Sequence, residues 1–184
     1  MTAVSGSVYT AAQFNTFVRD NLNETCPAKA SQSGSYFVTS GTNQIAERVI
    51  QQAFITQQDG CTATSYADPD QPGLAGSPPP VPGPALTVFT GTQALVVVGG
   101  RIGGGTVSTQ SVKMSWQVDG ATTISASDLW AAGAVGLGSS GFAYDSRAWL
   151  VTGLVQGLNT FTAKYAISSG TGYFSARSLL VMPF

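Results

Sequence analysis

The N-terminal end of the chain carries the clearest helical pattern of apolar positions. The apolar stripe recurs at spacings of three and four residues and consists of Ala11, Phe14, Phe17, Val18 and Leu22. Thr10 followed by Gln13 matches a capping box, in which each side chain satisfies a backbone N–H group of the first turn. Pro27 disfavours helical geometry at the residue before it. The pattern predicts one amphipathic helix, which at this length is marginal alone and needs a packing partner.

The remainder of the chain shows the short apolar runs that are typical of strands. Residues 35–50, SYFVTSGTNQIAERVI, contain two such runs around a polar turn at 40–43 and predict a β-hairpin. Residues 67–85, ADPDQPGLAGSPPPVPGPA, hold seven of the nine prolines. Because proline blocks both helix and sheet, this segment is predicted to be an extended spacer or a strap along a surface.

The C-terminal half is predicted to be a β-sandwich or jelly roll, because it consists of short β-rich runs separated by glycine and serine clusters. The runs are ALTVFT, QALVVVGGRI, VKMSWQV, ATTISA, RAWLVTGL, LNTFTAKYAI and YFSARSLLVM. Asp119-Gly120 between two of them is typical of a type I′ hairpin turn. The predicted fold class is mainly β. The domains are an N-terminal helix-and-hairpin attachment region at 1–66, a proline-rich spacer at 67–84 and the sandwich at 85–184.

The last run, YFSARSLLVMPF, is apolar on both faces. Strict alternation would place Phe174, Leu180 and Met182 on one face and Tyr173, Leu179 and Val181 on the other. A sandwich strand in a monomer normally alternates apolar inward and polar outward. The second face is therefore expected to meet another subunit, or to be covered by a loop of the same chain.

Charge is scarce in this chain. Only 9% of the residues are charged, whereas about 25% is usual, and the net charge is −1. Two explanations remain open: a surface solvated by hydroxyls and amides, or a surface hidden against identical copies. The absence of a basic run argues against nucleic-acid binding. No apolar run has the length of a membrane-spanning helix, and no signal peptide is recognisable, so we expect a protein made in the cytoplasm without membrane insertion.

Catalytic and metal chemistry have little support in the sequence. Histidine is absent, which removes the commonest general base, the Ser-His and Cys-His pairs and the commonest zinc ligand. The glycine-rich segments GGRIGGGT and GLGSSGF fit neither a phosphate-binding loop nor a nucleophile elbow. Cys26 and Cys61 match no metal spacing, and their spacing leaves open whether they form a disulfide. We expect no enzyme activity, no cofactor and no metal site.

Exposed aromatic side chains are the remaining candidates for ligand contact. Trp116 and Trp149 lie inside β runs and are predicted to belong to the core or to an interface. Trp130, in SASDLWAAGAVGLG, is expected to be exposed, and Tyr144 lies in the following segment. These two residues are the candidate contacts for a host-surface glycan.

Several segments carry a resemblance to a known class of proteins. They are TAAQFNTFVRDNLNETCPAKA, GSYFVTSGTNQIAERV, PGPALTVFTGTQALVVV and LNTFTAKYAISSGTGYFSARSLLVMPF. In these the chain resembles small structural proteins encoded by tailed bacteriophages of actinobacteria, of the minor tail or head decoration type. The resemblance implies a virion component with a C-terminal jelly roll similar to the trimeric tumour-necrosis-factor fold, and it transfers no catalytic residue.

The function expected from the sequence is that of a non-enzymatic virion protein, a homotrimer on the particle exterior. Phe14, Phe17, Val18 and Leu22 would anchor it to major capsid or tail proteins or form its oligomer interface. The β domain would be displayed outward, as capsid decoration, a head fibre or a minor tail protein. The alternative is a receptor- or glycan-binding tail fibre or knob that uses Trp130 and Tyr144.

Overall fold

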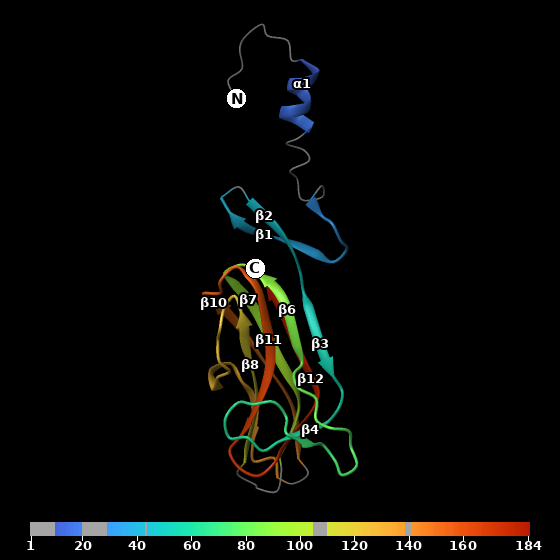
Figure 1. The fold of residues 1–184 in the computed structure, drawn as a ribbon, viewed down its shortest axis with the longest axis vertical. Helices are drawn as coiled ribbons and strands as arrows, with labels where there is room; N and C mark the ends of the chain where they lie inside the picture. Colours follow the sequence, from blue (N-terminus) through green and yellow to red (C-terminus); the bar gives the residue numbers. More distant parts are fainter. Residues whose placement is uncertain (1–9, 20–28, 43, 105–109, 139–140) are drawn as a thin grey trace. The chain divides into compact units, whose positions relative to one another are not determined.

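The chain forms two compact units, Met1–Val49 and Ile50–Phe184, which are described separately (Figure 1). The computed structural model describes residues 10–19, 29–42, 44–104, 110–138 and 141–184. The division after Val49 lies earlier than the sequence-based boundary at 66. The reason is that β3 (Gln51–Ile55) and β4 (Asp59–Cys61) both pair with β12 (Gly172–Pro183), the last strand of the sandwich.

The N-terminal unit begins with the predicted helix. Helix α1 (Ala11–Phe14) continues into a π-helical segment, Asn15–Arg19. The backbone N–H of Gln13 donates to Thr10 Oγ1 at 3.2 Å, and the backbone N–H of Thr10 donates to Gln13 Oε1 at 3.0 Å. The capping box is therefore confirmed. Residues 20–28, with the rest of the predicted helix, lie outside the described residues.

The predicted hairpin is also confirmed. Strands β1 (Ser35–Gly41) and β2 (Gln44–Val49) pair antiparallel. The Glu47 carboxylate on β2 accepts hydrogen bonds from the Ser31 and Ser35 hydroxyls and from the Ser31 backbone N–H. These donors lower the pKa of Glu47 to about 2, so the carboxylate stays charged and holds the segment before β1 against the hairpin at any physiological pH.

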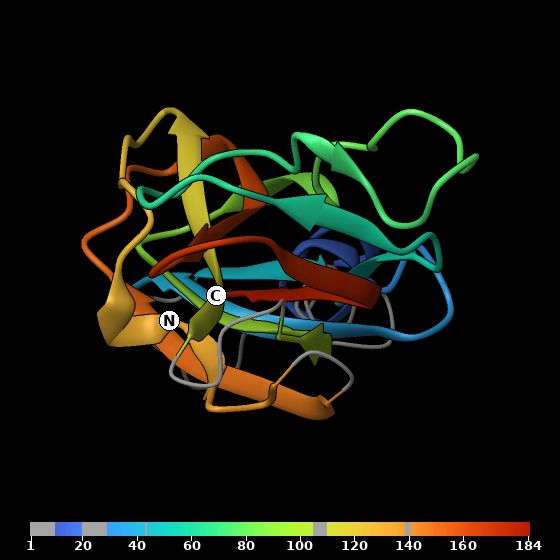
Figure 2. The same ribbon diagram turned by 90° about the horizontal axis from the view of Figure 1, so that it is seen from below.

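The second unit consists of two antiparallel sheets (Figures 1 and 2). The larger sheet has the order β10 (Phe142–Thr152), β7 (Gln93–Gly103), β12, β4 and β5 (Gln71–Pro72), with β3 also on β12. The smaller sheet has the order β6 (Ala85–Thr90), β11 (Gly157–Ile167), β8 (Ser111–Gly120) and β9 (Ala132–Val135). A 3₁₀ helix, Asp128–Trp130, precedes β9.

This strand order is that of a jelly roll. Along the chain, β6, β7 and β8 alternate between the two sheets, and so do β9, β10, β11 and β12. The resulting four-strand orders, β4–β12–β7–β10 and β6–β11–β8–β9, are those of the two sheets of that architecture, which is wound from two Greek keys. The predicted mainly-β fold with a C-terminal sandwich is confirmed.

The core lies between the two sheets and is aliphatic and aromatic. Its fully buried side chains include Val96, Val98, Ile102, Met114, Trp116, Phe161, Tyr165, Phe174, Leu179 and Val181. They come from alternating positions of long strands, which is why the β runs could be recognised in the sequence. Burial of one such large side chain stabilises the fold by about 1.5–3 kcal/mol.

Two details of strand assignment were wrong. The run ATTISA is not a strand, since it contributes a single bridge between Ile124 and Val118. Asp119 and Gly120 form no type I′ turn, because both extend β8 and pair with β11. Conversely, β9 was missed: its Ala-Gly-Ala-Val sequence has a weak strand propensity, and pairing with β8 determines its conformation.

A bulge in β12 changes which of its residues face the core. The register of β12 on β7 shifts between Ser175 and Ser178, and Ala176 adopts a positive φ of 48°. Phe174, Leu179 and Val181 are consequently all buried on one side. The expected grouping of Phe174 with Leu180 and Met182 was wrong because one inserted residue reverses the alternation.

The proline-rich segment is a strap along the sandwich. Ala67 exchanges two backbone hydrogen bonds of 2.9 Å with Tyr165 of β11. The Asp68 carboxylate accepts from Lys164 Nζ at 2.9 Å, and Val81 O accepts from Arg177 Nη1 at 3.0 Å. Residues 67–84 therefore contact the sandwich at both ends of the segment, as the strap alternative predicts, and do not separate two domains.

A buried ion pair fixes this strap. The side chains of Arg177 on β12 and Asp59 on β4 are both fully buried and bonded to each other. Asp59 Oδ2 also accepts from the backbone N–H of Val81 at 3.1 Å, and Oδ1 accepts from Gln57 Nε2 at 2.7 Å. We call the ion pair of Asp59 and Arg177 the buried clasp.

Candidate assembly surface and ligand-contact residues

The outer face of the larger sheet, turned away from the core, is the most distinctive surface of the sandwich. Residues that pair across β10, β7 and β12 stand in rungs on one face. In order, the rungs are Leu150–Leu95–Met182, Ala148–Val97–Leu180, Ser146–Gly99–Ser178, Tyr144–Arg101–Ser175 and Phe142–Gly103–Tyr173. We refer to these residues as the outer face. Phe54 of β3 extends the third rung, since it pairs with Ser178.

The outer face is nearly free of charge, and its first two rungs are wholly apolar. Its first three rungs contain no ionisable side chain, and Arg101 in the fourth is the sole charge among the five rungs. Large side chains on it are open to solvent: Leu150 is 51% exposed, Phe54 55% and Tyr144 78%. A contiguous apolar surface of this kind on a folded domain is typical of an interaction site.

The outer face of the smaller sheet differs in chemistry. Across β6, β11 and β8 it presents polar and charged side chains together with the exposed Phe89 and Leu158. The polar and charged members are Thr87, Thr160, Thr162, Gln117, Lys164, Lys113 and Asp119. Thr87 and Thr160 hydrogen-bond to each other through their hydroxyls at 2.9 Å. The outer face of the smaller sheet therefore mixes charged, polar and apolar side chains, whereas the first three rungs of the larger sheet carry no charge.

A hollow interrupts the outer face at its third rung. Its volume is about 470 Å³, and it lies between Phe54 and Tyr144 over Gly99. A Cβ atom on Gly99 would lie 2.7 Å from the Cβ of Ser146, so β7 and β10 need glycine at this point. The hollow is bordered by two exposed aromatic rings and can receive an apolar side chain from a partner.

Arg101 stacks on the ring of its neighbour Phe142 on β10. Its guanidinium lies 3.6 Å from the centroid of the Phe142 ring, in cation–π geometry. A Cβ on Gly103 would lie 2.3 Å from the same ring, so Phe142 lies directly over Gly103. The stacked arginine ends the apolar part of the face.

The predicted anchor residues are only partly described. Phe14 is 54% exposed and Val18 is 38% exposed, so both present apolar surface. Phe17 belongs to the π-helical segment, but its side chain lies outside the described residues, as does the whole of Leu22. Their role in anchoring stays a prediction.

The predicted ligand contacts Trp130 and Tyr144 are not brought together. Trp130 is half-buried: its ring stacks on Trp116 at a centroid distance of 5.0 Å, and its Nε1–H donates to Trp116 O at 3.1 Å. It also contacts Trp149, which faces away from the outer face on β10. Tyr144 lies on the opposite side of β10. Trp130 is therefore a packing residue, contrary to its expected exposure.

Sequence reasoning missed a polar cluster between the strap and the 3₁₀ helix. Tyr66 donates to Asp128 Oδ1 at 2.7 Å, and Lys113 Nζ lies 2.6 Å from Oδ2. Burial and the neighbouring carboxylate raise the pKa of Tyr66, while Lys113 and Tyr66 lower the pKa of Asp128. The cluster joins residues 62 positions apart, so no local motif could reveal it.

The thiol of Cys61 lies in the core of the sandwich. Cys61 is buried as a free thiol, and burial raises its pKa, while Cys26 lies outside the described residues. Over the described part of the chain, no three His, Cys, Asp or Glu side chains gather into a group that could hold a metal ion. None of the described helices is long and apolar enough to cross a membrane.

No protein-family model matches the chain, and no curated protein matches it. Among solved structures, the Eiger TNF of S. frugiperda aligns at 12% identity and a TM-score of 0.48, over 74% of this chain and 92% of that one. The VP2 subviral particle of infectious bursal disease virus aligns at 11% identity and a TM-score of 0.45, over 79% of this chain but 37% of that one. A CBM35 from Cellvibrio japonicus Abf62 reaches a TM-score of 0.33 at 14% identity, over 73% and 95%.

The jelly-roll assignment follows from the strand order of this chain itself. The resemblance to bacteriophage structural proteins stays a prediction.

Proposed function

We propose that the protein is a non-enzymatic structural protein of a virion that assembles as a homotrimer through the first three rungs of the outer face of its larger sheet. The observation that carries this proposal is the chemistry of that face. It carries no charge across its first three rungs, of which the first two are wholly apolar, and it keeps Leu150 and Phe54 open to solvent. Such side chains are stabilised by about 1.5–3 kcal/mol each when a partner covers them.

The lack of charge on the first three rungs indicates which kind of partner can cover them. A partner that presented lysines or carboxylates to the first three rungs would bury these charged groups without a counter-charge. The same face of another copy avoids this cost, because it is itself uncharged there. Gains at several identical interfaces add up, and together they offset the roughly 4–15 kcal/mol that association costs in lost freedom. This supports identical subunits arranged around a common axis.

The oligomeric state is tested by measuring the mass of the full chain in solution. We expect a particle of three times the chain mass of 18.9 kDa at micromolar concentration. The mass should change little with added salt, because apolar contacts are not screened. A chain that sediments as a monomer under these conditions would rule the proposed interface out.

The virion part of the proposal rests on the N-terminal unit. It is compact in itself, and its helix exposes Phe14 and Val18, which a neighbouring capsid or tail protein would cover. The resemblance to small bacteriophage structural proteins, of the minor tail or head decoration type, supports the same placement.

Removal of residues 1–49 should separate attachment from assembly. We expect residues 50–184 to keep their melting temperature and oligomeric state, because the core and the outer face lie wholly within this unit. Incorporation into particles should be lost when the truncated chain replaces the full one, as measured by its abundance in purified virions. Normal incorporation of the truncated chain would contradict the assignment of attachment to the N-terminal unit.

A further inference from the structure

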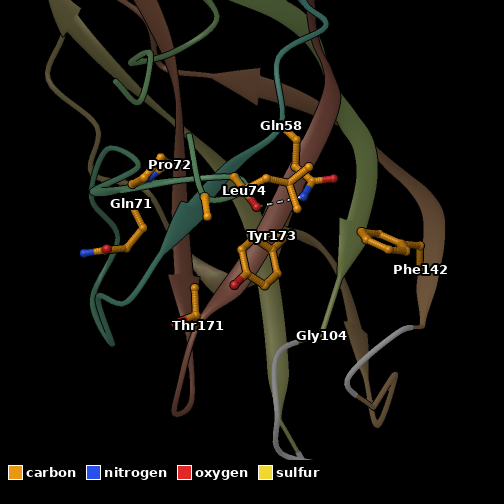
Figure 3. A pocket seen from close by; sticks show the side chains of 10 residues that line it. Gln58, Gln71, Pro72, Leu74, Gly104, Phe142, Thr171 and Tyr173 are labelled. Atoms are coloured by element: carbon orange, nitrogen blue, oxygen red, sulfur yellow. Dashed lines mark hydrogen bonds between the residues drawn. The ribbon is translucent and has the colours of Figure 1, made fainter. Parts of the chain in front are cut away.

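A groove at the fifth-rung end of the sandwich has the features of a small-molecule site (Figure 3). Its volume is about 540 Å³, within the range of about 300–1,000 Å³ typical of ligand pockets. The side chains that form it include Gln58, Gln71, Leu74, Phe142, Thr171 and Tyr173. All come from the second unit, so one chain supplies the whole groove, and its rings Phe142 and Tyr173 belong to the fifth rung, outside the three rungs proposed for assembly.

The walls of the groove are held by backbone pairing. Gly60 on β4 pairs with Gln71 on β5. A Cβ on Gly60 would lie 3.0 Å from the Cβ of Gln71 and 3.2 Å from Cγ2 of Thr171. Glycine at this position therefore lets the two polar side chains stand beside each other.

A second contact fixes the opposite wall. Gln58 Nε2 donates to Gly73 O at 3.1 Å, which holds the turn that carries Leu74 (Figure 3). A Cβ on Gly73 would lie 2.1 Å from Gln58 O, so the backbone of the turn lies directly against Gln58, the residue before β4. The site is thus formed before any ligand arrives, which lowers the entropic cost of binding.

The lining is neutral and offers both donors and acceptors. No Asp, Glu, Lys or Arg is among the described residues that line the groove. The Gln71 amide, the Thr171 hydroxyl and the Tyr173 hydroxyl make no hydrogen bond to other described residues, and Gln58 uses only its NH₂ group. Amides and hydroxyls each donate and accept, as the hydroxyls of a sugar do.

Apolar surface accompanies these polar groups. Phe142 on β10 and Tyr173 on β12 both pair with Gly103 of β7, which lies between these two strands. Leu74 lies above Tyr173 in the close-up view (Figure 3). A pyranose ring has the matching character, with C–H groups on its faces and hydroxyls at its edge. We propose that this groove binds a neutral sugar residue.

The test is a binding measurement on the full-length protein with methyl glycosides of glucose, galactose, mannose, arabinose and N-acetylglucosamine at millimolar concentration. Saturation-transfer NMR detects weak binding of this kind through the ligand signals. We expect at least one of these neutral glycosides to bind, and glucuronic acid to bind more weakly than glucose. The absence of binding by every neutral probe, or a preference for the acid, overturns the proposal.

Two variants locate the binding. Gln71→Ala, on an exposed two-residue strand, should weaken it roughly three- to tenfold through the loss of a hydrogen bond. Tyr173→Leu removes the ring and should abolish it; the melting temperature verifies that this variant folds. Tyr144→Ala, an exposed aromatic outside the groove, serves as the matched control and should leave binding unchanged. Loss of binding in the control alone would place the sugar at Tyr144 and overturn the groove assignment.

Discussion

Ala148→Glu is expected to convert the proposed trimer into folded monomers. Ala148 lies in the second rung of the outer face, between Trp149 and Arg147 along β10 and beside Val97 across the strand pair. It is solvent-exposed in the single chain, so a glutamate there can point into water and the sandwich should keep its stability.

In the assembled state the same carboxylate would be buried against apolar side chains. An uncompensated buried charge costs several kcal/mol, and each 1.4 kcal/mol weakens association about tenfold. The substitution is repeated in every copy, so we expect the dissociation constant to rise by roughly a thousandfold or more. Sedimentation velocity of the variant and the wild-type chain measures the change directly.

The matched control is Ala85→Glu. Ala85 is also an exposed alanine on a strand, but it begins β6 in the smaller sheet. This variant should remain oligomeric. If both variants assembled like the wild type, the outer face of the larger sheet would not be the interface; if both dissociated, the effect would reflect net charge and not position.

Local patterns predicted the parts of the fold that depend on neighbouring residues. Thr10 and Gln13 revealed the capping box because a cap and its partner lie three positions apart. The strands β6, β7, β8, β10, β11 and β12 were recognisable from β-branched and aromatic runs. The hairpin of β1 and β2 followed from two such runs around a polar turn.

Other features depend on partners far away in the chain. The inclusion of β3 and β4 in the sandwich is decided by their pairing with β12, more than a hundred residues later. The bulge at Ala176 leaves no mark in the sequence, yet it decides that Leu180 and Met182 face outward. The apolar pattern on both sides of this strand indicated a second contact surface, and only the register shows which residues form it.

The candidate contacts show the same limit. Trp130 belongs to a segment rich in small residues and was expected to be exposed, but Trp116 of β8 and Trp149 of β10 pack against it. The groove that holds Gln71 and Tyr173 was not recognisable, because its residues are spread from Gln58 to Tyr173 and carry no motif spacing.

Breaking the buried clasp is expected to cause the largest loss of stability of any single charge substitution in the sandwich. Arg177 and Asp59 are both 0% exposed and lie 118 positions apart in the chain. Asp59→Asn leaves the guanidinium of Arg177 buried without a counter-charge, and Arg177→Met does the same to the carboxylate. Each should lower the free energy of unfolding by about 3–5 kcal/mol and the melting temperature by roughly 10–15 °C.

The double variant Asp59→Asn with Arg177→Met distinguishes a broken ion pair from general damage to the core. Because no unpaired charge remains, it should be more stable than the sum of the two single losses implies. Asp128→Asn is the control for an exposed pair: the Asp128 side chain is 64% exposed, so its loss should cost below about 1 kcal/mol. Thermal and urea unfolding of the four variants measure these differences. Strict additivity of the two clasp variants would mean that Arg177 and Asp59 act separately, and that the strap at Val81 is held by its backbone contacts and not by the pair.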